Sequence, residues 1–158
     1  MSTTYVPADL RRTVIQRADR LCEYCLIHRD DTYFGCEVDH IISEKHGGGT
    51  DADNLAYACL ACNRAKGSDL GSLATGSSQL VRFFDPRRDL WSDHFGFGSD
   101  LELVPRTEIG EVTVRIFGFN APERLIERRV LHEESRYPTP EALKRIEGEA
   151  KPSHPSAR

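Results

Sequence analysis

The sequence predicts an α+β fold in which a small unit of two strands and a helix is clamped by a four-cysteine zinc site and followed by an α+β C-terminal extension. The four cysteines form two Cys-x-x-Cys pairs, Cys22 with Cys25 and Cys59 with Cys62, separated by 33 residues. Two short loops that each offer two thiolates suit one tetrahedral zinc ion, with zinc–sulfur bonds of about 2.3 Å. Between the pairs, short β-branched and aromatic segments flank a glycine-rich loop, which is typical of paired strands.

The composition changes near residue 71, and this change predicts the domain organisation. We expect the zinc-clamped domain over residues 8–70 and a small, polar linker over 71–79. An α+β extension over 80–147 is expected to pack on the first domain. The segment 148–158 has two prolines and little to bury, which predicts a disordered tail.

Local patterns predict each element of the first domain. Apolar residues at helical spacing indicate an amphipathic helix, and aromatic and β-branched residues indicate strands. Three consecutive glycines require a loop. In chain order we expect a helix over 8–21, strands over 32–34 and 36–42, a loop over 43–53, a strand over 55–59 and a helix over 63–70.

The extension shows weaker patterns. A helix over 122–134 is favoured because Asn120 can cap it and Pro122 suits its first turn. Thr139 followed by Pro140 predicts the start of a further short helix. Leu125, Ile126, Val130 and Leu131 are expected to share one face of the longer helix, and strands are expected over 80–84, 112–117 and, more weakly, 101–104.

Composition excludes several classes of protein. The 158 residues are 39% apolar, yet no apolar stretch approaches the roughly 18 residues of a membrane-spanning helix. The first residues lack the pattern of a secretory signal, so we expect a cytoplasmic protein without membrane contact. The net charge is −4 and neither half is basic, which excludes a general nucleic-acid coat. Contact with nucleic acid would therefore depend on a local patch or on the charge of a bound metal.

The cysteines favour a metal site over disulfides or redox chemistry. All five lie in the N-terminal half, and an odd number in a chain without a secretory signal is untypical of a disulfide framework. A thiol redox protein needs one reactive Cys-x-x-Cys and leaves the second pair unexplained. Cys36 is left over, and we interpret it as a small buried thiol on a strand.

Four features around the cysteine pairs have the chemistry of phosphodiester hydrolysis. Asp39 and His40 end a predicted strand, Asn54 follows the glycine loop, and Asn63 directly follows the last cysteine. Histidine suits the deprotonation of water near neutral pH, and carboxylate and amide oxygens suit a hard divalent cation. Each residue alone also has an ordinary structural explanation, as a surface hydrogen bond, a turn or a helix cap. Their combination favours a catalytic site.

The motifs together resemble the HNH endonuclease family, in the zinc-knuckled branch of the ββα-metal or His-Me finger superfamily. The resemblance covers about residues 10–70, under half of the chain. It is specific, because order, spacing and residue type agree at about ten positions. The matching residues are Cys22-x-x-Cys25, Val38-Asp39-His40-Ile41-Ile42, Gly47-Gly48, Asn54-Leu55 and Cys59-x-x-Cys62-Asn63-x-x-Lys66-Gly67.

The resemblance implies a role for each matched residue. His40 would be the general base that activates water, and Asp39 and Asn63 would bind one catalytic divalent cation, Mg²⁺ or alternatively Mn²⁺ or Ni²⁺. Asn54 would hold the long loop and orient the histidine by hydrogen bonding. The four paired cysteines would bind structural Zn²⁺. Similar proteins leave a 5′-phosphate and a 3′-hydroxyl.

Lys66 and Arg64 lie just beyond Asn63 and are candidates for phosphate contact, although solvated charges on a helix explain them equally well. We therefore expect a metal-dependent DNA endonuclease acting as a monomer or homodimer, with RNA or modified DNA left open as substrates. The alternative is a non-catalytic, zinc-stabilised nucleic-acid-binding module of the same fold. The sequence shows no recognition helix from which specificity could be predicted.

Overall fold

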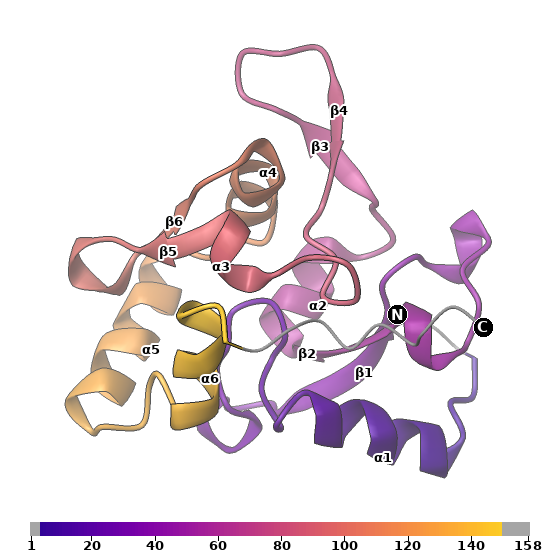
Figure 1. The fold of residues 1–158 in the computed structure, drawn as a ribbon, viewed down its shortest axis with the longest axis horizontal. Coiled ribbons are helices and arrows are strands. Elements are labelled where there is room, and N and C mark those ends of the chain that lie inside the picture. The colour runs from indigo at the N-terminus through magenta and orange to yellow at the C-terminus, as the bar shows by residue number, and fades with distance from the viewer. Residues whose placement is uncertain (1–3, 150–158) are drawn as a thin grey trace.

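The computed structural model of the chain describes residues 4–149, and none of the helices in that range is long and apolar enough to cross a membrane. Most of the tail expected at 148–158 lies outside the described residues. The first elements in chain order are α1 (Ala8–Arg17), η1 (Arg29–Asp31), β1 (Cys36–His40), η2 (Glu44–His46), η3 (Ala52–Asn54), β2 (Leu55–Cys59) and α2 (Leu60–Lys66) (Figure 1). They are followed by β3 (Gly71–Leu73), β4 (Leu80–Arg82), α3 (Trp91–His94), β5 (Phe95–Phe97), η4 (Ser99–Leu101), β6 (Leu103–Pro105), α4 (Glu108–Ile116), α5 (Pro122–Glu133) and α6 (Pro140–Ile146).

The structural unit that positions the candidate site is the β1–β2 hairpin with α2. The two strands pair antiparallel, from Cys36 opposite Cys59 to His40 opposite Leu55. All five residues of β2 are buried, which explains the continuous apolar run in its sequence. The helix begins directly after β2, earlier than the expected 63–70, and ends at Gly67, whose φ is +52°. The predicted mixed helix-and-strand class is thus confirmed.

Two expectations for this unit differ from the structure. The segment 32–34 is a turn, not a strand, and Tyr33 and Phe34 are 93% and 71% exposed. Their aromatic rings pack on each other in a T-shaped arrangement instead of on a sheet. The helix expected over 8–21 ends at Arg17, because Asp19 and Arg20 adopt positive φ.

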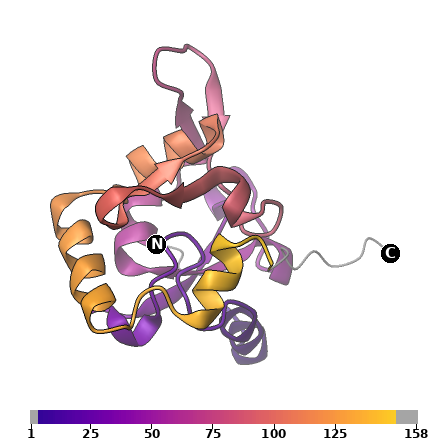
Figure 2. The same ribbon diagram turned by 60° about the vertical axis from the view of Figure 1, so that its left-hand side comes forward.

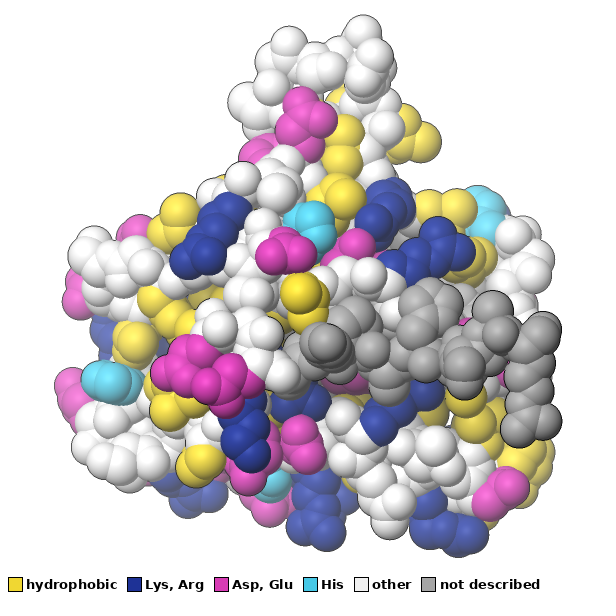
Figure 3. Space-filling view, viewed as in Figure 1, with side chains coloured by type: hydrophobic (Ala, Val, Ile, Leu, Met, Phe, Trp, Pro, Cys, Tyr) yellow, Lys and Arg dark blue, Asp and Glu magenta, His cyan; other side chains and the backbone are white. Residues whose placement is uncertain are grey.

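The segment expected as a linker over 71–79 supplies β3 and the turn of a second hairpin. Gly71 lies opposite Arg82, and Leu73 lies opposite Leu80. A side chain at Gly71 would place its Cβ 2.2 Å from the Val81 carbonyl oxygen, so only glycine permits this close pairing. The turn end of the hairpin projects beyond the rest of the molecule (Figures 1–3).

The extension contains a second correction, because residues 112–117, expected to be a strand, belong to α4 and the turn after it. Thr107 caps this helix by accepting a hydrogen bond from the Gly110 amide. Val112 and Thr113 are buried on one side of it. The β-branched residues that suggested a strand thus fill the apolar stripe of an amphipathic helix. The expected short helix after Thr139 is present as α6, with the Thr139 hydroxyl as its cap.

One hydrophobic core joins the extension to the first cysteine loop. The Tyr24 ring lies 5.1 Å from the Phe117 ring and 6.4 Å from the Phe84 ring, measured between centroids. The Trp91 indole donates a hydrogen bond to the Tyr24 carbonyl (2.9 Å), and the Tyr137 hydroxyl donates to the Cys25 carbonyl (3.0 Å). The extension therefore covers the backbone of the residues that carry the first two cysteines.

Candidate zinc centre and active site

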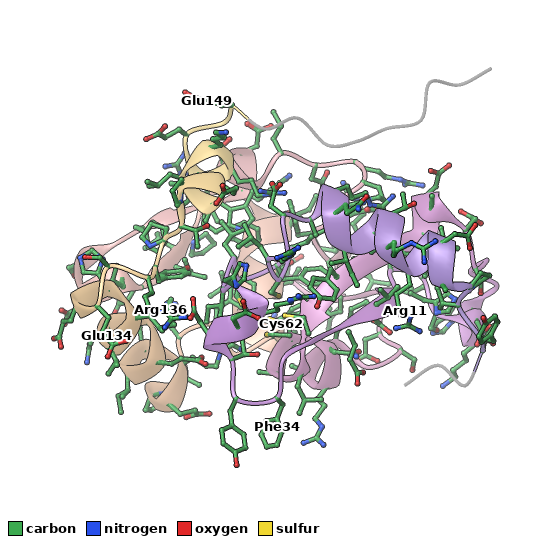
Figure 4. All side chains as sticks on the ribbon, turned by 90° about the horizontal axis from the view of Figure 1, so that it is seen from below. Arg11, Phe34, Cys62, Glu134, Arg136 and Glu149 are labelled. Atoms are coloured by element: carbon green, nitrogen blue, oxygen red, sulfur yellow. The ribbon has the colours of Figure 1, made fainter. Side chains whose placement is uncertain are left out.

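The four paired cysteines gather at one buried point. Their sulfur atoms all lie within 4.8 Å of one another, and the Cys25 and Cys59 sulfurs are 3.7 Å apart. A tetrahedral zinc ion with bonds of about 2.3 Å requires sulfur–sulfur separations of about 3.8 Å. Figure 4 shows Cys62 in the interior of the molecule. The arrangement fits a four-thiolate structural zinc site, and Cys36 lies outside the group.

Local backbone geometry places each pair. In the first loop, the Cys22 amide donates to the Ile27 carbonyl and the Leu26 amide donates back to the Cys22 carbonyl, both at 2.8 Å. Leu26 has a φ of +65°, which turns the chain sharply after the second cysteine. In the second pair, Cys59 ends β2 and Cys62 lies in the first turn of α2. A zinc ion would therefore bind the start of α2 to the first loop.

Arg124 of α5 is a feature of this centre that the sequence did not predict. It is 6% exposed, and its Nη2 lies 3.5 Å from the Cys62 sulfur and 4.0 Å from the Cys59 sulfur. Burial by itself would lower the pKa of this guanidinium, but the negative charge of the neighbouring thiolates outweighs burial and raises it. The arginine thus offsets part of the double negative charge that four thiolates leave around one zinc ion.

The face of α5 that is buried explains why this contact was missed. The expected apolar face included Ile126 and Val130, yet these are 58% and 47% exposed. The buried side carries Arg124 and Arg128, four residues apart, with Leu131. The four-residue spacing of Arg124 and Arg128 places them on the same helix face, but arginine on a helix is ordinarily interpreted as an exposed charge.

Replacing Arg124 with methionine is expected to speed the loss of zinc to a chelator about tenfold, because partners of metal ligands commonly contribute 10–100-fold to metal affinity. The Arg124→Lys variant keeps the charge and should lose less. Arg129→Met removes an exposed arginine from the same helix and is the matched control. A zinc-responsive dye follows the release. Equal rates for Arg124→Met and Arg129→Met would contradict a role at the zinc centre.

His40 and Asp39 occupy the last two positions of β1, and both are buried. His40 is 2% exposed, and its Nε2 lies 2.8 Å from the Thr50 hydroxyl. Its Nδ1 makes no hydrogen bond to any other residue of the described range 4–149. Thr50 was not among the predicted site residues, and its place after the glycine run gave no specific signal. The imidazole is thus held by a hydrogen bond at Nε2, and Nδ1 has no hydrogen-bond partner among residues 4–149.

Asn54 holds the loop between His40 and β2. Its Oδ1 accepts from the Ile42 amide (2.9 Å), and its Nδ2 donates to the carbonyls of Ile42 (2.8 Å) and Gly49 (2.9 Å). A side chain at Gly48 would meet the Ile42 carbonyl oxygen at 1.7 Å, so the loop can close only on glycine. Asn54 therefore joins the two sides of the loop, while the histidine ring itself is bonded to Thr50.

Asn63 and Lys66 lie three residues apart on α2, so they share a helix face. Asn63 is 6% exposed, and its side chain makes no hydrogen bond within residues 4–149. The Lys66 ammonium donates to Asp39 Oδ2 at 3.2 Å and to the His40 carbonyl at 2.8 Å. This bond between α2 and β1 brings the Asn63 helix face beside the end of the strand.

The setting of Lys66 differs from the phosphate contact that was expected. The residue is 2% exposed, and its ammonium also donates to the Gly67 carbonyl at 3.2 Å. Three oxygen acceptors occupy the ammonium, so its structural role is to join α2 to β1. Arg64 is exposed on the same helix, where its guanidinium is accessible to a ligand. The sequence could not separate these two cations, because both follow Cys62 at similar distances.

The donor set beside Lys66 fits a hard divalent cation. Asp39 offers a carboxylate and Asn63 an amide oxygen, and oxygen ligands are those that Mg²⁺ and Mn²⁺ prefer. The Asn63 amide makes no hydrogen bond within residues 4–149, which leaves its oxygen available to a cation. These two residues would hold the cation.

A comparison with family models identifies the same segment. Residues 22–69 match the HNH endonuclease family, and the matched range includes both cysteine pairs, His40 and Asn63. No curated protein and no solved structure showed significant similarity to the chain. The matched range coincides with the unit that carries the sulfur cluster, so the similarity to the HNH endonuclease family falls on residues 22–69.

Proposed function

We propose that the chain is a metal-dependent endonuclease that hydrolyses DNA phosphodiester bonds. The proposal is supported by the contact between β1 and α2. There the Lys66 ammonium donates to Asp39 and to the His40 carbonyl, and Lys66 lies on the same face of α2 as Asn63. A general base and two oxygen ligands of a cation are thus supplied by neighbouring elements. The match to a nuclease family over these residues supports the same reading.

In this mechanism His40 accepts a proton from water. When Nε2–H is donated to the Thr50 hydroxyl, Nδ1 carries the lone pair that takes the proton, and the hydroxide attacks phosphorus. A cation held by Asp39 and Asn63 would neutralise the negative charge that develops on the phosphate. Asn54 keeps the loop closed and so fixes Thr50 relative to the histidine. The bond between phosphorus and the 3′ oxygen breaks as hydroxide attacks, and the leaving 3′ oxygen takes up a proton from solvent, so the products are a 5′-phosphate and a 3′-hydroxyl.

The test is cleavage of an end-labelled duplex by zinc-loaded protein, with Mg²⁺, with Mn²⁺ and with EDTA. The proposal predicts cation-dependent cleavage and product ends that DNA ligase can rejoin, which requires a 5′-phosphate and a 3′-hydroxyl. Binding of the duplex without cleavage under both cations would contradict the proposal and favour the non-catalytic, zinc-stabilised binding module. The same assay on RNA and on modified duplexes identifies the substrate class.

Replacing Asp39 with asparagine is expected to weaken Mn²⁺ binding by about tenfold or more, equivalent to about 1.4 kcal/mol. The reason is that the variant removes the negative charge of one of the two cation ligands. Asp69→Asn removes an exposed carboxylate just after α2 and is the matched control. Isothermal titration with Mn²⁺ measures both variants, and zinc content verifies their fold. Equal Mn²⁺ affinity in the two variants would exclude Asp39 as a ligand.

A further inference from the structure

The β3–β4 hairpin begins beside the candidate active site. Four residues separate Lys66, at the end of α2, from Gly71 at the start of β3, and the Phe83 amide closes the foot of the hairpin by donating to the Leu70 carbonyl (3.0 Å). A pocket of about 190 Å³ lies at this foot. It is lined by residues from both sides, including Ile41 next to His40 and Arg82 at the end of β4. The pocket therefore places the foot of the hairpin beside Lys66 and beside Ile41, the residue that follows His40.

Residues 71–81, all of the hairpin except Arg82 at the end of β4, carry no charge, in a chain of which 29% is charged. Residues 71–81 contain no acidic, basic or histidine side chain, and they are rich in hydroxyl and amide groups. Leu73 and Leu80 are directly opposite in the strand register and are 51% and 73% exposed. Residues directly opposite in an antiparallel pair lie on the same face. The hairpin thus presents one apolar pair among uncharged polar groups.

Contacts with α4 hold the hairpin in place. The Thr75 hydroxyl donates to Glu111 at 2.5 Å, and the Arg115 guanidinium donates to the Leu73 carbonyl. Val81 packs against the main hydrophobic core. The two leucines are therefore exposed on a hairpin whose position is fixed by hydrogen bonds to α4.

Two partly exposed arginines lie at the foot of the hairpin, each beside a carboxylate. Arg82 makes two hydrogen bonds to Asp89 (2.7 and 2.8 Å) with its side chain 43% exposed, and Arg88, 63% exposed, lies 3.5 Å from Asp85. Figure 3 shows Lys and Arg side chains on the surface below the projecting hairpin. Exposed guanidinium groups suit phosphates. A two-stranded ribbon suits a DNA groove, because the major groove, about 12 Å wide, admits such a ribbon.

We propose that the β3–β4 hairpin enters a groove of duplex DNA and places Leu73 and Leu80 against base edges, while Arg88 contacts the backbone. This inference rests on the proposed function and names a duplex as the substrate. The exposed guanidinium group of Arg88 and the pocket that links the hairpin foot to Ile41, next to His40, favour DNA as the occupant. A protein partner fits less well, because two leucines supply little of the roughly 1,200–2,000 Å² that a specific protein interface buries.

The test is the affinity of the zinc-loaded full chain for a fluorescently labelled duplex of randomised sequence, in Ca²⁺. The Leu73→Ser/Leu80→Ser variant removes the apolar pair without adding charge. Ile126→Ser/Val130→Ser removes an equally exposed pair from α5, away from the hairpin (Figure 1). We expect the hairpin variant to lose about tenfold in duplex affinity, a typical loss when buried interface side chains are truncated. The α5 variant should be unchanged, and thermal unfolding and zinc content verify the fold of both.

Each outcome separates the hairpin from the catalytic proposal. Equal loss of affinity in both variants, or no loss in either, would overturn the role of the hairpin while leaving DNA cleavage untouched. Hairpin-dependent binding without cleavage by the wild type would support the hairpin and contradict the proposed function. Unchanged DNA affinity combined with loss of a wild-type dimer in sedimentation would assign the leucine face to a second copy of the chain and overturn the inference.

Discussion

Replacing His40 with alanine is expected to lower the rate of DNA cleavage by about 10²–10⁴-fold, the usual contribution of a general base. The imidazole is 2% exposed and fixed through Nε2, which leaves Nδ1 for the water. Because His40 lies at the end of β1 and is not a zinc ligand, the variant should retain its zinc. Single-turnover cleavage of labelled duplex measures the loss.

The control for this prediction is His28→Ala, which removes a half-buried histidine from the same domain whose ring accepts a hydrogen bond from the Asp30 amide. Its cleavage rate should equal that of the wild type. Added imidazole should restore part of the activity of His40→Ala, because a small base can occupy the vacated space. Unimpaired cleavage by a zinc-loaded His40→Ala protein would show that another group activates the water.

Replacing Cys59 with serine is expected to lower the free energy of unfolding by more than about 4 kcal/mol, in the range reached when a structural metal is lost. Cys59 is the residue at which β2 passes into α2, so zinc at this position holds the β1–β2 hairpin to the helix. Circular dichroism and thermal unfolding measure the loss, with zinc content determined in parallel. Cys36→Ser is the matched control, because Cys36 is paired with Cys59 across the strands but lies outside the sulfur cluster. Retention of stability in Cys59→Ser would contradict the structural role of the metal.

The same zinc centre predicts the direction of a pH effect. Burial raises the pKa of the Cys22 and Cys62 thiols in the metal-free protein, so zinc must displace their protons when it binds. Protons therefore compete with zinc, and the stabilisation that zinc provides is lost as pH falls. Thermal unfolding with a fixed amount of zinc at successively lower pH measures this. A stability independent of pH across the range in which zinc is released would contradict the assignment.

The part of the fold that the sequence predicted well is the part determined by local pattern and by the cysteines. The strand over 55–59 agrees with β2 residue for residue, because its run of small and aromatic apolar residues is short and ends at a cysteine. The four paired cysteines gather as their spacing indicated. Each of these features depends on neighbours close in sequence or on the chemistry of one ion.

What the sequence did not predict depends on long-range packing. Val112 and Thr113 suggested a strand, but packing of α4 against the hairpin and the core overrides their β propensity. Lys66 was explained equally well as a solvated charge, and no sequence pattern pointed to Arg124, yet both are buried because groups from distant segments surround them. The partners of Arg124 lie 62 and 65 residues earlier in the chain. The pattern of neighbouring residues along a helix does not reveal that a buried charge is neutralised by groups so distant in the sequence.

Conversion of supercoiled plasmid by wild type and His40→Ala proteins that hold equal zinc, in Mg²⁺ and then in Mn²⁺, tests whether the chain is an endonuclease with His40 as its base. We expect cleavage by the wild type alone, with open circles from a single active site and linear product where two copies act together. Cleavage by neither protein, with both holding one zinc ion, would contradict the proposed endonuclease activity and favour a binding module.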